Sequence, residues 1–142
     1  MSNGRIRKNW EVTALELAFK IADCRSEDPY KQVGSCAIYK QGFRVCLGYN
    51  GAPSGIELDW SDREEVLKRV LHSETNVLNW VQPGEIELLA ITHIPCSECI
   101  KVIAQKQIKR VVYSNLLSSV NKDFVHQLAK EYKIDLKQIK LN

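Results

Sequence analysis

One stretch decides the fold of this chain: Glu87-Leu88-Leu89-Ala90-Ile91-Thr92-His93-Ile94-Pro95-Cys96-Ser97-Glu98-Cys99. Its first part, 87–94, contains a continuous apolar run, which is typical of a strand buried on both faces. After the proline, apolar residues recur at helical spacing and predict a helix over 96–107. A buried strand that passes directly into a helix indicates an α/β architecture.

The elements on either side follow from periodicity and turn residues. Before this stretch we expect helices at 10–24, 62–71 and 72–81, with Trp80 in the core, and a hairpin of strands 33–39 and 43–49. After it we expect a strand at 111–113, a helix at 120–132 and a final strand or edge element at 134–139. This order predicts a single mixed sheet with helices on both faces, in one domain over 1–142.

Composition excludes several classes of protein. The 142 residues are 44% hydrophobic and 26% charged, which is ordinary for a soluble globular protein. The net charge of +3 is weakly basic, and the lysines of the last third alternate with acidic residues, so we expect a solvated surface and no nucleic-acid partner. No apolar run is long enough to span a membrane, and the polar N-terminus has no signal-peptide character, which predicts a cytoplasmic protein.

Cys96, Cys99 and His72 form the main chemical feature. Two thiols three residues apart on the first turn of a helix, with one imidazole, supply three ligands for zinc and leave one position open. Glu74 lies two residues after the histidine, as a base beside the metal. This pattern of residues is the signature of zinc-dependent nucleobase deaminases.

Other interpretations of these residues remain open. His93 is the best candidate for a fourth ligand if the zinc is structural, and a lone C-x-x-C is also compatible with redox chemistry. Motif order, the proline and the helix placement favour a catalytic zinc. The other cysteines, Cys24, Cys36 and Cys46, are expected in the core and not at a second metal.

Several linked motifs together resemble the deoxycytidylate (dCMP) deaminase family of the cytidine deaminase superfamily. They are the segments 25–29 and 32–36, the loop 48–55, the histidine motif 72–76 and the cysteine motif 95–99. The resemblance implies a cytidine-deaminase-like three-layer fold with a central mixed five-stranded sheet. It also implies zinc-dependent hydrolysis of dCMP to dUMP and ammonia.

The resemblance assigns roles to individual residues. It implies zinc ligation by His72, Cys96 and Cys99, and it makes Glu74 the proton shuttle. The substrate-binding residues that it implies are Arg25 and Ser26 at the 5′-phosphate, Asn50 at the nucleoside, and the Ser73 backbone at the base.

Three departures from the family pattern stand out. Ser73 occupies a position where the family usually has alanine, which adds a hydroxyl next to the base pocket. The segment 114–121 lacks the tyrosine and basic residue that family members tend to place over the nucleotide, so we expect Lys122 or a neighbouring subunit to complete the phosphate site. The segment between the loop at residue 50 and His72 is short and leaves little room for an accessory metal lobe.

Family members are commonly hexamers that dCTP with Mg²⁺ activates and dTTP inhibits. By resemblance, the effector region would comprise Asp28, Gly48, Tyr49, Gly51 and Gly55. A glycine-rich loop with free N–H groups also suits phosphate oxygens on physical grounds.

Two alternatives in function stay open. The chain could be another zinc deaminase, acting on a free nucleoside, guanine or tRNA adenosine, although the aromatic stacking residues and broad basic surface of a nucleic-acid editor are lacking. It could also be a non-catalytic, zinc-stabilised nucleotide-binding module. The intact Glu74 argues against this second alternative.

Overall fold

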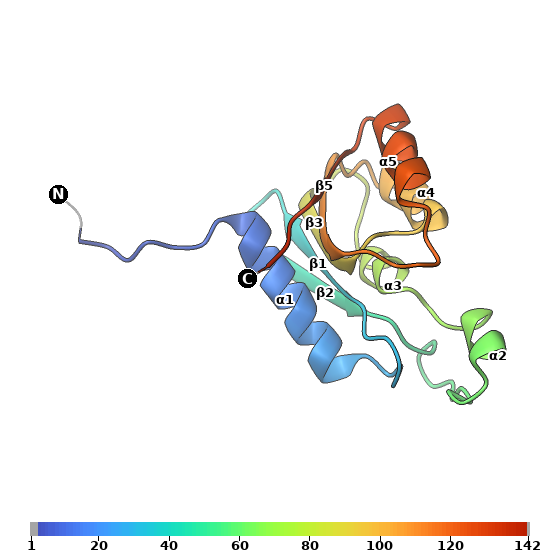
Figure 1. The fold of residues 1–142 in the computed structure, drawn as a ribbon. Coiled ribbons are helices and arrows are strands. Elements are labelled where there is room, and N and C mark those ends of the chain that lie inside the picture. The colour runs from blue at the N-terminus through green and yellow to red at the C-terminus, as the bar shows by residue number, and fades with distance from the viewer. Residues whose placement is uncertain (1–2, 142) are drawn as a thin grey trace.

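The computed structural model describes residues 3–141 and shows a five-stranded sheet in the order β2-β1-β3-β4-β5 (Figure 1). β1 is antiparallel to both β2 and β3, whereas β3, β4 and β5 run parallel. The elements are α1 (Trp10–Arg25), β1 (Gly34–Tyr39), β2 (Val45–Tyr49), α2 (Arg63–Leu67), α3 (Ser73–Leu78), β3 (Ile86–His93), α4 (Ser97–Gln105), β4 (Arg110–Asn115), α5 (Lys122–Glu131) and β5 (Asp135–Gln138). The predicted mixed sheet is confirmed.

The sheet separates two cores. On one face α1 covers a smaller cluster, in which Leu15 packs with Ile38, Leu88 and Val112. On the other face α3, α4 and α5 enclose the larger cluster (Figure 1). Neighbouring residues of β3 alternate between the two clusters, as side chains of a strand must. The result is the three-layer arrangement that the sequence predicts.

Side-chain caps fix where several helices begin. Asn9, Asp62 and Asn121 each accept a hydrogen bond from a backbone N–H of the first turn of α1, α2 and α5. Several elements are shorter than predicted, and for two of them the cause is a local backbone feature. Gly42 and Phe43 adopt positive φ in the hairpin turn, so β2 begins only at Val45. α2 ends early and the chain straightens, because Leu71 pairs with Gly51 in an isolated β-bridge.

Gly48 brings α3 unusually close to β2. A Cβ atom at this position would lie 2.7 Å from the Ser73 carbonyl oxygen and 2.7 Å from the Val77 nitrogen, closer than real Cβ atoms approach. Only glycine therefore permits the observed spacing between this helix and the sheet.

The structure contradicts two predictions about the core. Trp80 is 72% exposed, because α3 ends at Leu78 and the helical pattern does not continue to residue 81. Cys24 is exposed near the end of α1, whereas Cys36 is buried and Cys46 is half-buried as expected. Within residues 3–141, no helix has both the length and the apolar character that crossing a membrane requires.

Candidate metal centre and active site

Three potential metal ligands converge at the starts of two helices. His72 is the N-cap residue of α3, Cys96 is the N-cap residue of α4, and Cys99 lies in the first turn of α4. The His72 Nδ1 atom is 3.3 Å from the Cys99 sulfur and 3.7 Å from the Cys96 sulfur, and the two sulfurs are 3.3 Å apart. The histidine thus forms one compact cluster with two cysteines that lie 24 and 27 positions later in the sequence.

The donor set of this cluster fits zinc. Ligands that surround a tetrahedral zinc ion at about 2.0–2.3 Å are separated from one another by about 3.3–3.8 Å, which matches the observed distances. The cluster has three donors, so a tetrahedral zinc ion held by them would keep one position for a further ligand, and His72 and Cys96 line the adjacent cavity. His93 does not belong to it, and the structure gives no support to a fourth protein ligand at this residue.

The thiols are arranged to bind a cation. The two cysteine sulfurs share a hydrogen bond, which lowers the pKa of Cys96, and the Cys99 backbone N–H donates to the Cys96 sulfur. This sharing of one proton, together with burial, raises the pKa of Cys99. The pair therefore favours one thiolate and one thiol in the absence of a metal, and a dication between the sulfurs favours two thiolates.

Glu74 is buried beside the cluster and held by a chain of hydroxyl groups. The Ser73 hydroxyl donates a hydrogen bond to Glu74 Oε1 at 2.7 Å. Since its only proton is used there, the Ser73 oxygen accepts the proton of the Ser35 hydroxyl, 2.6 Å away. Burial raises the pKa of Glu74, and the Ser73 hydroxyl opposes this effect. A carboxyl group that is fixed and partly desolvated suits proton transfer.

A cavity of about 180 Å³ opens in front of these groups. We term the metal cluster and its neighbours the metal side: His72, Ser73, Glu74 and Cys96, which line the cavity, and Cys99 behind them in the cluster. Another part of its lining, which we term the loop side, comprises Asp28, Lys31, Val33, Asn50 and Arg63. Lys31 and Arg63 were not predicted as site residues, because no sequence motif marks them.

Asn50 fastens the loop side together. Its amide oxygen accepts hydrogen bonds from the Ser26 hydroxyl and the Val33 N–H, and its amide nitrogen donates to the Lys31 carbonyl. Asn50 itself is buried and lines the cavity. This residue therefore joins the loop after β2 to the segment before β1.

Asp28 and Arg63 form a second connection on the loop side. Arg63 Nη2 lies 2.8 Å from Asp28 Oδ2, and its guanidinium group stacks over the Tyr30 ring. The other carboxylate oxygen of Asp28 accepts hydrogen bonds from the Tyr30 and Lys31 N–H groups. Asp28, predicted as an effector residue, thus lines the same cavity as the metal cluster.

The remaining predicted residues lie in different places. Arg25 is exposed at the end of α1 and does not line the cavity. Ser26 does not line it either, but its hydroxyl group donates to Asn50 and accepts from the Asp28 N–H, and both of these residues line it. Lys122, in the first turn of α5, does not line it either. His93 lines the cavity, and burial, and next the charge of Lys31, lower its pKa.

The glycine-rich loop does not form one surface. Gly48 is buried under α3, the Tyr49 carbonyl accepts a hydrogen bond from the Asn76 amide, and Gly51 packs against Glu27. Gly55 has a positive φ, and a Cβ there would meet nothing within 4 Å. These residues provide turns and close approaches, and their predicted role in effector binding stays a prediction.

Comparison with models of protein families shows to which family the chain belongs. The model of the cytidine and deoxycytidylate deaminase zinc-binding region matches residues 8–115, which include all three cluster residues and Glu74. The chain belongs to this deaminase family. The human deoxycytidylate deaminase is 32% identical over 114 residues, which cover 73% of this chain and 64% of the human protein. A probable deoxycytidylate deaminase of Drosophila melanogaster is 34% identical over 105 residues, covering 63% of this chain and 51% of that protein.

Solved structures of the deaminase fold superpose well on the chain. A dCMP deaminase from the cyanophage S-TIM5, in complex with dCMP and dUMP, has a TM-score of 0.73 at 24% identity and covers 94% of this chain and 100% of that one. A tRNA A34 deaminase has a TM-score of 0.60 at 20% identity, covering 90% of this chain and 98% of that one. These likenesses establish the deaminase fold of the chain, and the chain spans 64% of the human relative.

Proposed function

We propose that this protein is a zinc-dependent deaminase that hydrolyses dCMP to dUMP and ammonia. The observation that carries the proposal is the buried Glu74 carboxyl next to a three-ligand cluster that leaves one metal position open. Relatives named deoxycytidylate deaminases and a similar structure solved with dCMP and dUMP support the choice of substrate.

His72, Cys96 and Cys99 would hold the zinc. When bound, zinc supplies the Lewis acidity that makes water a nucleophile at neutral pH. Because the cluster contributes at most two thiolate charges and one neutral imidazole, the metal site is close to neutral overall. A near-neutral site does not oppose the charge that develops on the attacking oxygen.

Glu74 moves the protons of the reaction. It accepts a proton from the attacking water and delivers it to N3 of the cytosine ring while the oxygen adds to C4. It then carries the second water proton to the amino group, which leaves C4 as ammonia and yields uracil. The hydrogen bond from Ser73 holds one carboxylate oxygen in place, so the other is available to the substrate.

Asn50 and the Ser73 backbone are the proposed contacts to the nucleoside. Both residues are buried and line the cavity, Asn50 on its loop side and Ser73 on its metal side. The side chain of Asn50 already makes its hydrogen bonds within the protein, so we propose that it acts mainly by fixing the shape of the loop side.

Substitution Glu74→Gln tests the proposal. We expect a fall in kcat/KM for dCMP of about 10²- to 10⁴-fold, the usual contribution of a general acid–base, with one zinc per chain retained. Glu98→Gln is the matched control, because Glu98 likewise lies in the first turn of a helix of the metal cluster, α4, but is exposed and paired with Lys101. Ammonia release and zinc content are measured for both. A Glu74→Gln variant as active as the Glu98→Gln variant would contradict the mechanism.

Regulation by dCTP with Mg²⁺ and by dTTP, and assembly into a hexamer, stay predictions from the family resemblance. Steady-state kinetics on dCMP with and without each nucleotide tests the first, and light scattering of the purified protein tests the second. A hyperbolic rate curve that neither nucleotide changes would rule out the regulation and leave the catalytic proposal standing.

A further inference from the structure

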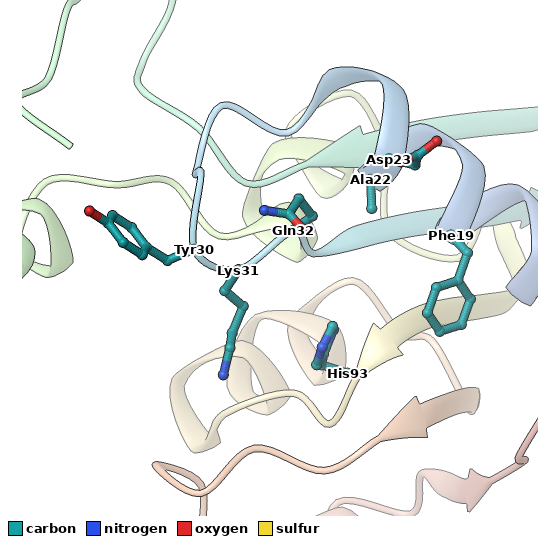
Figure 2. Close-up of a pocket in the computed structure, with 7 residues that line it drawn as sticks. All are labelled: Phe19, Ala22, Asp23, Tyr30, Lys31, Gln32 and His93. Carbon is teal, nitrogen blue, oxygen red and sulfur yellow. The ribbon is translucent and has the colours of Figure 1, made fainter. Parts of the chain in front are cut away.

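Two cavities meet at Lys31 and His93. Beside the 180 Å³ cavity lies a second, of about 300 Å³, lined by Phe19, Ala22, Asp23, Tyr30, Lys31, Gln32 and His93 (Figure 2). Lys31 and His93 line both of them. In Figure 2 the Lys31 side chain extends from its loop to the level of His93, with its amino group turned away from Phe19. Lys31 therefore stands at the border of the catalytic cavity, on its loop side.

The positive charge of Lys31 is not neutralised by a neighbouring acid. Among residues 3–141, no carboxylate oxygen lies within 4.0 Å of the Lys31 amino group. Asp28, the nearby acid in the sequence, is engaged by Arg63 through one oxygen and by backbone N–H groups through the other. Of the two cations on the loop side, Arg63 is thus paired and Lys31 is available for an anion.

The backbone of Lys31 is held firmly although its side chain is exposed. Its N–H donates to Asp28 Oδ1, and its carbonyl accepts a hydrogen bond of 2.9 Å from the Asn50 amide. Asn50 also lines the catalytic cavity. The hydrogen bond between Asn50 and the Lys31 carbonyl therefore fixes the backbone position from which the lysine side chain extends on the loop side.

We propose that Lys31 binds the 5′-phosphate of the substrate and so determines the preference for a nucleotide over the unphosphorylated nucleoside. This inference rests on the proposed deamination of a pyrimidine nucleotide. A flexible ammonium group with three donors suits a terminal phosphate dianion, and the bond is charge-assisted. Lys31 takes the role that the sequence assigned to Arg25 and to Lys122, neither of which lines the cavity.

Replacement of Lys31 by methionine tests the inference, with turnover of dCMP and deoxycytidine measured side by side. We expect kcat/KM for dCMP to fall about 10- to 100-fold, as for loss of one charge-assisted hydrogen bond, and that for deoxycytidine to stay unchanged. Lys31→Arg keeps the charge and should retain most of the activity on dCMP. Lys20→Met, an exposed lysine of α1, is the control. Because the Asp28 and Asn50 contacts use only backbone atoms of residue 31, these variants keep the loop intact.

The outcomes separate the two proposals. Equal losses on both substrates, or no loss on dCMP, would overturn the role of Lys31 while leaving the deaminase assignment intact. A wild-type protein that turns over neither substrate would refute the proposed function. In that case calorimetric binding of dCMP to the zinc-loaded wild type and Lys31→Met proteins still decides on the phosphate contact: weaker binding to the variant supports it and equal binding overturns it.

Discussion

The metal side and the loop side of the cavity are held in place by different means. On the metal side each functional group sits at the start of a helix, and α3 and α4 pack directly on the larger core. On the loop side no regular element carries Asp28, Lys31 or Asn50, and their positions depend on hydrogen bonds between distant segments. The metal side is thus fixed by packing, and the loop side by a few polar contacts. We therefore expect substitutions on the metal side to lower turnover, and substitutions on the loop side to lower the stability of the protein.

The largest effect is expected from removal of zinc. Chelation should abolish activity on dCMP, by more than about 10³-fold, because the chain alone cannot activate water. The secondary structure should persist, since buried residues such as Val77 and Ile100 hold α3 and α4 on the sheet. Activity assays and far-UV circular dichroism measure the two, and zinc, but not magnesium, should restore turnover. Unfolding on chelation would show that the metal side is not held by packing.

A loop-side substitution should cost stability first. Asn50→Ala leaves the Val33 N–H and the Lys31 carbonyl without their partners, which we expect to lower the free energy of unfolding by about 2–4 kcal/mol. Denaturant titration measures this. Asn79→Ala, at the exposed end of α3, is the control and should change stability by less than about 0.5 kcal/mol. Similar values for both variants would mean that the polar contacts do not hold the loop side.

A metal-side substitution should affect turnover without affecting binding. Ser73→Ala removes the hydrogen bond to Glu74 Oε1, and we expect kcat to fall roughly 3- to 10-fold with KM for dCMP unchanged, a barrier change of about 1 kcal/mol. Ser35→Ala should lower kcat in the wild type but have little further effect in the Ser73→Ala background, because it acts through Ser73. Additive losses in the double variant would contradict the hydroxyl chain.

The smallest effect is expected for Tyr30→Leu. The Tyr30 ring is 65% exposed and contacts the Arg63 guanidinium only from one side. Loss of this contact should lower the free energy of unfolding by about 0.5–1 kcal/mol. A loss above about 2 kcal/mol in thermal or denaturant unfolding would show that the loop side depends on this stacking as much as on the contacts of Asn50.

The contrast between the two sides also explains what the sequence could predict. His72, Glu74, Cys96 and Cys99 lie in two short motifs at helix starts, and helical spacing places the members of each motif together at the start of one helix. The alternation of β3 between two cores likewise follows from a local pattern. By contrast, Arg63 meets Asp28 across 35 positions, and no periodicity brings them together. Asn50 and Asp28 were expected at a binding site by resemblance, but the pairing of Asp28 with Arg63 and the place of Lys31 became visible only in the structure.

The errors have similar causes. Trp80 fits the helical spacing of the apolar residues before it, but α3 ends at Leu78 and Trp80 is exposed. Apolar spacing alone does not show at which residue a helix ends. Cys24 was expected in the core because free cysteine is usually buried, but it lies at the exposed end of α1. Arg25 does not line the cavity, whereas Lys31, six residues later, does, and the contact of Arg25 with the phosphate stays a prediction.

Gly48 controls the position of α3, although it takes no part in the chemistry of the site. A single methyl group there would act as a wedge under α3 and would lift the helix that begins with His72 and Glu74. The position of the Glu74 carboxyl group on α3 relative to the zinc ligands on α4 thus depends on the distance between the backbones of α3 and residue 48. For a protein engineer, residue 48 is a place to retune the geometry of the site without altering any residue that performs its chemistry.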